Sequence, residues 1–131
     1  MKKTLIIVAS VLGILIIGGI IFFKITIKKM NEEIDREFAN MPQIDVASIP
    51  DGTYSAKWGS FVVKADLDVV VSGGKIEKIN MKKMDSGKGY EGLETIDRII
   101  SSQKVKVDAV TGATYSSKVI MITTAKALER K

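Results

Sequence analysis

The chain opens with a long apolar segment. Thr4 to Phe23, TLIIVASVLGILIIGGIIFF, is twenty residues without a charged side chain. As an α-helix rising ~1.5 Å per residue it spans roughly 30 Å, the thickness of the hydrocarbon core of a bilayer. A cleaved signal peptide has a shorter apolar core and a small-residue cleavage site, whereas the residues that follow here, IIFFKITIKK, are bulky. The pattern therefore predicts a short tail and an uncleaved transmembrane anchor over residues 1–23.

Beyond the anchor, the pattern becomes one apolar stripe on an otherwise polar helix. Apolar side chains recur at spacings of three and four with charged residues between them. The stripe consists of Ile27, Met30, Ile34, Phe38 and Met41. Pro42 ends it, because proline disfavours helical backbone at the preceding residue. We expect residues 24–50 to form an amphipathic stalk and linker, whose stripe either packs against the chain's own domain or docks a partner helix.

From residue 51 onward the pattern changes to that of a β-hairpin. Apolar and polar positions alternate from Phe61 to Val71, the sequence SGGK makes a turn, and residues 75–84 return as a second strand. A glycine-rich loop, MDSGKGYEG, follows the hairpin.

The remainder of the chain reads as helix, strand, helix. A helix is expected over residues 91–103, a short strand over 105–110 from its alternating valines, and a final helix over 117–128. The buried face expected for the first of these helices is Leu93, Ile96, Ile99 and Ile100. The fold class predicted for residues 51–131 is α+β, with a small antiparallel sheet packed against two helices.

Composition and charge exclude several classes of protein. The chain of 131 residues has a formal net charge of +5, but residues 1–30 hold five lysines and no acidic residue, so residues 31–131 are neutral. A nucleic-acid-binding domain needs a basic footprint, so we expect no nucleic-acid partner. The chain has neither cysteine nor histidine, which excludes disulfides, thiolate metal sites and catalysis by a Ser/His or Cys/His pair. We expect no metal site and no catalytic residue.

The orientation of the anchor is not decided by its flanking charges. Two lysines precede the apolar segment and three follow it closely. A short N-terminal tail before a first apolar span is normally kept in the cytoplasm, however. We therefore expect a single-pass protein of the cell membrane with an extracytoplasmic domain.

The segment DAVTGATYSS, residues 108–117, is unusually small and rich in hydroxyl groups. One interpretation is structural: Ser116 or Ser117 caps the final helix and Thr-Gly-Ala is a tight turn. The other is an anion site, since Gly112 and Ala113 would let a phosphate approach the backbone at the start of a helix. The hydroxyl groups available for such a site belong to Thr111, Thr114, Ser116 and Ser117. The residues alone leave both interpretations open.

The same segment resembles the flavinylation motif of the FMN-binding domain family: Asp, a small residue, any residue, Ser or Thr, then Gly-Ala-Thr and hydroxyl residues. The resemblance covers residues 51–129, including DGTYS, the hairpin DVVVSGGKIEKINM and SGKGYEGLETIDRIISSQKVKVDAV. The family includes the C subunit of the sodium-translocating NADH:quinone reductase, the G subunit of the Rnf complex and many short bacterial proteins. In this family, FMN is joined through its phosphate to the last threonine of Gly-Ala-Thr.

The resemblance implies specific roles for residues of this chain. Thr114 is the implied covalent FMN acceptor, modified by a separate FAD:protein FMN transferase, and the recognition residues around it are Asp108, Thr111, Gly112 and Ala113. Further cofactor contacts are expected from Tyr115, Ser116 and Ser117 and from the loop glycines Gly87 and Gly89. Many small members carry a histidine shortly before that loop; here Lys82, Lys83 or solvent must take its place.

The resulting expectation is a membrane-anchored electron-transfer flavoprotein. Its partners would be the transferase, the lipid bilayer and a membrane redox protein, either a quinone-reductase-type complex or another flavoprotein. An electron carrier fits better than an independent enzyme, because the chain shows no nucleotide-binding motif for a hydride donor. Two alternatives remain: a flavin reductase that binds FMN non-covalently, and a flavin-free interaction module of the same fold.

Overall fold

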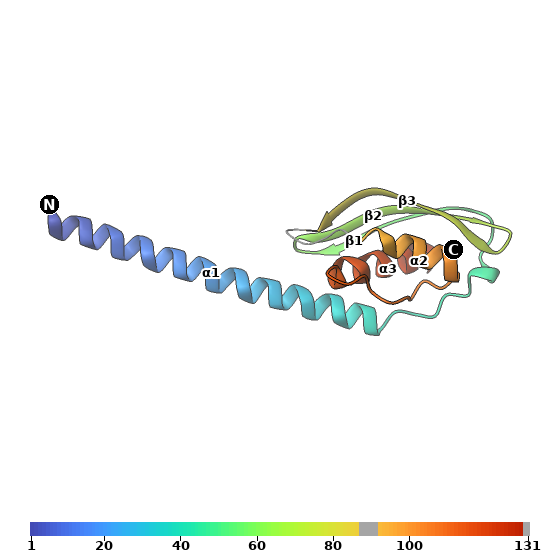
Figure 1. The fold of residues 1–131 in the computed structure, drawn as a ribbon, viewed down its shortest axis with the longest axis horizontal. Coiled ribbons are helices and arrows are strands. Elements are labelled where there is room, and N and C mark those ends of the chain that lie inside the picture. The colour runs from blue at the N-terminus through green and yellow to red at the C-terminus, as the bar shows by residue number, and fades with distance from the viewer. Residues whose placement is uncertain (87–91, 130–131) are drawn as a thin grey trace.

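A computed structural model of the chain describes residues 1–86 and 92–129. One long helix leads into a small domain in which a sheet lies over two helices (Figure 1). The sheet is antiparallel with three strands in the order β1-β2-β3. The predicted α+β class, with an antiparallel sheet, two helices and a preceding apolar helix, is confirmed.

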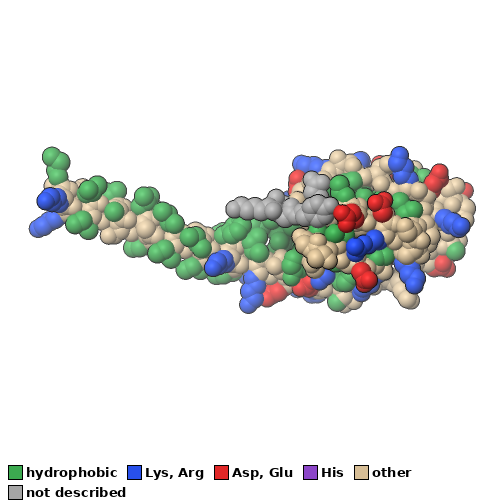
Figure 2. Space-filling view, in the orientation of Figure 1, with side chains coloured by type: hydrophobic (Ala, Val, Ile, Leu, Met, Phe, Trp, Pro, Cys, Tyr) green, Lys and Arg blue, Asp and Glu red, His purple; other side chains and the backbone are tan. Residues whose placement is uncertain are grey.

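Helix α1, Lys2–Ala39, is continuous through the predicted anchor and into the predicted stalk and linker, of which it covers residues 24–39. Its apolar part is long enough to cross a membrane, and none of that part is buried in the protein. Figure 2 shows hydrophobic side chains exposed along the part of the helix that extends away from the domain. The helix ends at Ala39, two residues before Met41, the last residue of the apolar stripe in the sequence.

The second part of α1 packs against the domain. Ile34 is fully buried and Met30 is 5% exposed, in a cluster that includes Val119 and Ile122 of helix α3 (Thr114–Glu129). The other three residues of the sequence stripe, Ile27, Phe38 and Met41, pack against the same cluster. Of the two interpretations of the stripe, the structure shows the one in which it covers the chain's own domain.

The sheet is formed by β1 (Gly52–Ser60), β2 (Val63–Ser72) and β3 (Lys75–Ser86). Alternate residues of β2 are buried, as its sequence predicts, because one face of the sheet packs on the helices and the other meets solvent. Strand β1 was not predicted, and Phe61 lies in the turn before β2 instead of in the strand.

Helix α3 lies between the sheet and α1, and eleven of its sixteen residues are buried. It has no polar face, because both of its sides are covered. Two threonines in its interior, Thr123 and Thr124, donate their hydroxyl hydrogens to the carbonyls four residues earlier, at 2.6 and 2.8 Å. Those bonds satisfy hydroxyls that would otherwise be buried without a partner.

The predicted strand over residues 105–110 is wrong. Val105 and Val110 are buried as the alternation predicts, but the segment packs beside α3 and pairs with no strand among the described residues. Two of its backbone N–H groups donate to side chains of α3. Val107 N–H donates to the Met121 sulfur at 3.2 Å, and Val110 N–H donates to Ser117 Oγ at 3.0 Å. Alternating burial therefore arose here without a sheet.

Both helices begin at different residues from those predicted. Helix α2 covers Glu94–Ser102, so Leu93 precedes it and is 40% exposed, while Thr95 is fully buried instead. Helix α3 begins at Thr114, three residues earlier than expected. The hydroxyl-rich segment therefore runs from a turn into the first turn of a helix.

Candidate functional site

The centre of the candidate site is a tight turn from Val110 to Ala113. The Ala113 N–H donates to the Val110 carbonyl at 2.9 Å, which closes the turn. Gly112, its third residue, has a φ of +81°, a value that side-chain-bearing residues adopt only at a cost. A Cβ at Gly112 would meet nothing within 4 Å. The glycine is needed for its backbone angle, and the space beside it is open.

Thr114 follows this turn as the first residue of α3 and is exposed. Thr111 and Gly112 are exposed as well, whereas Ala113 is buried at 4%. The first amide groups of a helix lack intrahelical acceptors and carry the positive end of the helix dipole, which favours a negative charge nearby. The site therefore presents an accessible hydroxyl where a phosphate is electrostatically favoured.

The two serines of the segment are internal. Ser117 is fully buried; its hydroxyl accepts from Val110 N–H at 3.0 Å and donates to the Ala113 carbonyl at 2.6 Å. Both bonds tie the turn to the helix that follows it. Ser116 is 4% exposed. In this structure Ser117 stabilises the turn from within α3 instead of capping the helix, because both serines lie after the helix start at Thr114. Neither serine lies on the open surface around Thr114.

Tyr115 faces α1. Its hydroxyl donates to Asp35 Oδ2 at 3.4 Å, and Lys118 Nζ lies 2.6 Å from Asp35 Oδ1. Burial, and secondly the negative charge of Asp35, raises the pKa of the Tyr115 hydroxyl above its usual range, so it remains protonated. The residue after Thr114 thus joins the site to the long helix.

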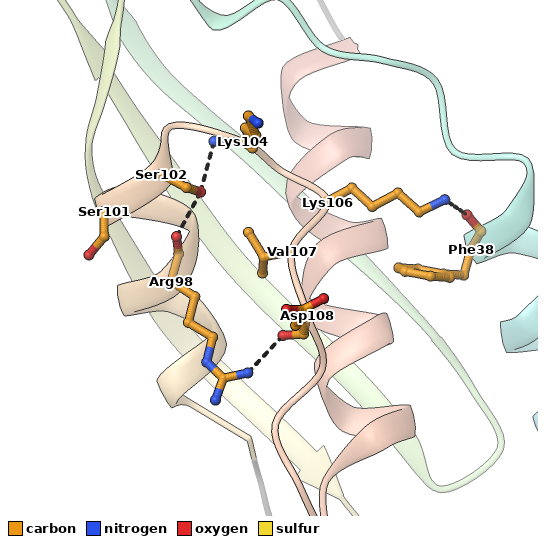
Figure 3. Close-up of a pocket in the computed structure, with 8 residues that line it drawn as sticks. All are labelled: Phe38, Arg98, Ser101, Ser102, Lys104, Lys106, Val107 and Asp108. Carbon is orange, nitrogen blue, oxygen red and sulfur yellow. Dashed lines mark hydrogen bonds between the residues drawn. The ribbon is translucent and has the colours of Figure 1, made fainter.

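Asp108 precedes the turn and lines an open groove of about 800 Å³. Arg98 of α2 reaches across and donates from Nη1 to the carbonyls of Asp108 and Ala109, at 2.9 and 3.2 Å (Figure 3). These bonds hold the backbone that leads into the turn. Sequence reasoning missed Arg98, because its partners are main-chain carbonyls and leave no pattern in the sequence.

The end of the glycine-rich loop also reaches the site. Gly92 has a φ of +68°, and a Cβ there would lie 3.2 Å from Ala113 Cβ and 3.1 Å from Ser117 Oγ. A larger residue would push against the start of α3. Gly87 and Gly89, predicted as cofactor contacts, lie outside the described residues. Gly92 was not predicted, although its place at the end of a glycine-rich loop was a signal.

Lys82 lies on the other face of the sheet from the helices. It is the extra residue where β3 bulges opposite Asp66 and Leu67, and its Nζ is 3.2 Å from both Asp66 and Asp68. These carboxylates raise the pKa of Lys82. Lys82 is therefore paired on the solvent face and does not approach Thr114 in this structure.

One of the comparisons with known proteins identifies a family domain that includes the turn. A model of the FMN-binding domain matches residues 58–129, more than half of the chain, including the whole Asp108–Ser117 segment. No curated protein and no solved structure matches the chain.

Proposed function

The chain belongs to the FMN-binding domain family, and on that premise we propose that it is a membrane-anchored electron-transfer flavoprotein carrying FMN covalently on Thr114. The observation that carries the proposal is the exposed hydroxyl of Thr114 at the start of α3, after a turn with open space at Gly112. The open space beside Gly112 offers a side from which a phosphate group could approach this hydroxyl.

The residues present fit a phosphoester at this position. Thr114 supplies the oxygen, the first turn of α3 supplies the favourable end of a helix dipole, and Gly112 leaves open space beside the turn. Asp108 is exposed, and its backbone, which leads into the turn, is held by Arg98. We assign it to recognition by the modifying enzyme.

Attachment requires a second enzyme. A threonine hydroxyl is a poor nucleophile unaided, and the chain holds no histidine to activate it. In the proposed reaction an FAD:protein FMN transferase removes the Thr114 hydroxyl proton. The new bond joins Thr114 Oγ to the FMN phosphorus of FAD, the bond between the two phosphates of FAD breaks, and AMP leaves.

When bound, FMN supplies one- and two-electron redox chemistry. The protein's own contribution is to hold that group on a tethered domain, in reach of a membrane redox partner. We propose that α1 crosses the cell membrane and that the domain is extracytoplasmic. Covalent attachment suits that location, because a cofactor that dissociated there would be lost by dilution.

The test of covalent attachment compares two threonine variants. The full chain is produced with and without the transferase, denatured, and examined for flavin fluorescence in the gel and for an FMN adduct by intact mass. We expect an adduct only with the transferase, lost in Thr114→Val and retained in Thr53→Val. Thr53 is an exposed threonine of β1 and serves as the matched control.

Other outcomes of this experiment contradict the proposal. Flavin that copurifies but is released on denaturation would support the non-covalent flavin reductase. Absence of flavin in the presence of an active transferase would support the flavin-free interaction module. Orientation is tested separately: protease added to spheroplasts should digest the domain, and full protection would place it in the cytoplasm.

A further inference from the structure

The turn between β1 and β2 carries an unusual apolar pair. Ser60 pairs with Val63, so the turn consists of Phe61 and Val62. Phe61 is 46% exposed; among the described residues after α1, the only other exposed large hydrophobic side chain is Leu93, at 40%. A phenylalanine at the tip of a solvent-exposed turn is costly in water, because its apolar surface stays hydrated.

The backbone at Phe61 adds to that cost. Its φ is +48°, the left-handed region, which is uncommon for any residue except glycine and an outlier for a bulky one. Two-residue hairpin turns normally place glycine or asparagine at such a position. The turn at the other end of β2 follows the rule, with Gly73 and Gly74 at φ values of +61° and +73°. The chain thus uses glycine at one turn and phenylalanine at the other.

The two turns differ in their position relative to α1. β2 runs from Val63 to Ser72, ten residues, so they lie at opposite ends of the sheet, roughly 30 Å apart at ~3.3 Å per residue. The Phe61 turn is at the end nearest the apolar half of α1 (Figure 1). The Phe61 ring meets the Phe23 ring edge-on, with centroids 6.3 Å apart. Phe23 is the last residue of the uncharged segment, and Lys24 follows it.

We propose that the Phe61–Val62 turn is a second membrane contact, seated at the lipid–water interface beside the point where α1 leaves the bilayer. The inference rests on the proposed membrane anchor. Burial of Phe61 in the interface removes its exposed apolar surface from water, which offsets the cost of its backbone conformation. The exposed lysines Lys24 and Lys64 flank the contact and can meet anionic headgroups.

The contact would fix how the domain sits on the membrane. A helix anchor alone permits rotation of the domain about the point of entry. The Ser60 hydroxyl donates to Glu33 of α1, which already ties the end of β1 to the helix. With the neighbouring turn in the interface, the domain is held at two points, so the turn that carries Thr114 keeps one orientation towards membrane partners.

The test uses single cysteines, because the chain has none of its own. Phe61→Cys, Lys75→Cys and Phe22→Cys are prepared in the full chain, labelled with a bimane fluorophore and reconstituted into vesicles of neutral and anionic phospholipids with nitroxide groups near the headgroup end of the acyl chains. Lys75 is exposed beside the Gly73–Gly74 turn, and Phe22 is in the proposed anchor. Nitroxide quenching reports contact with lipid directly.

We expect quenching at Phe61→Cys within about twofold of that at Phe22→Cys, and several-fold stronger than at Lys75→Cys, because interfacial groups lie roughly 5–10 Å into the boundary. Equal, weak quenching at positions 61 and 75 with strong quenching at position 22 would overturn the turn contact and leave the anchor standing. Weak quenching at position 22 would overturn both. Protease sensitivity on vesicles is a second readout. Protease added to the vesicles should cleave the Phe61→Asp chain faster than the Phe61→Leu chain, and equal rates would contradict the contact.

Discussion

Gly112 provides the sharpest test of how the site is built, because one methyl group separates the backbone requirement from the steric one. In Gly112→Ala the added Cβ meets nothing within 4 Å. Any loss of stability therefore comes from forcing alanine to a φ of +81°. That cost is about 1–2 kcal/mol for an L-residue in the left-handed region. It is partly offset because alanine loses less conformational freedom on folding than glycine.

The expected net effect is a loss of about 1 kcal/mol, equivalent to roughly 4–8 °C in Tm for a domain of this size. The measurement is thermal unfolding of the full chain in detergent, followed by circular dichroism. Gly73→Ala is the matched control: Gly73 also has a positive φ, +61°, and nothing within 4 Å of a Cβ. Both variants should lose similar stability.

Covalent flavin attachment should separate the two variants. Gly112→Ala changes the turn before Thr114, so we expect attachment by the transferase to slow at least about tenfold, a change of ~1.4 kcal/mol in the barrier. Gly73→Ala should be modified at the normal rate. An unchanged Tm in Gly112→Ala would refute the left-handed conformation of this turn. Equal attachment rates in the two variants would refute the claim that the glycine geometry presents Thr114.

Three further outcomes follow from the packing and the charges. Ile34→Ala removes a fully buried side chain between α1 and α3 and should cost ~2–5 kcal/mol in urea unfolding, whereas Ile25→Ala, at a position 51% exposed, should cost little in detergent. Arg98→Gln should slow flavin attachment while Lys104→Gln, on the same groove, should not, because it is Arg98 that donates to the Asp108 and Ala109 carbonyls before the turn. Hydrogen bonds, first from Ser55 and then from Lys82, lower the pKa of the Asp68 carboxyl below its ordinary value of 3.8. The contribution of the Asp68 carboxylate to stability is therefore full above pH 3.8 and is lost as the pH falls through the lower pKa of the folded state. Asp68→Asn should therefore flatten the decline of the urea midpoint below about pH 4; an unchanged slope would show that the bonds do not persist in solution.

Elements with a strong periodic pattern were predictable from the sequence. The apolar segment, the stripe of the stalk and the alternation in β2 each follow from a repeated local rule, namely the absence of charge, a spacing of three and four, and a period of two. The motif around Thr114 was identified through its resemblance to a known family, since the residues alone left both a helix cap and an anion site open. The sequence therefore determined the long apolar helix and the fold class, and it pointed to Thr114 as the candidate acceptor.

The valines of 105–110 show where that reasoning fails. Alternation reports which side chains are buried, but the same burial arises against a helix as against a sheet. Only the tertiary contacts, Val107 with Met121 and Val110 with Ser117, decide that the segment pairs with no strand among the described residues. Strand β1 was missed because its own residues alternate weakly, and it is held by pairing with β2 from Val63 to Val71.

Interactions between distant parts of the chain were decided by the tertiary structure alone. The sequence left the partner of the stalk open, and the buried positions of Met30 and Ile34 against α3 settle it. The bonds from Arg98 to backbone carbonyls, the approach of Gly92 to Ala113 and the meeting of Phe23 with Phe61 depend on which surfaces come together. Local rules fix each segment's periodicity, whereas such contacts depend on how the segments pack, and packing is a property of the whole chain.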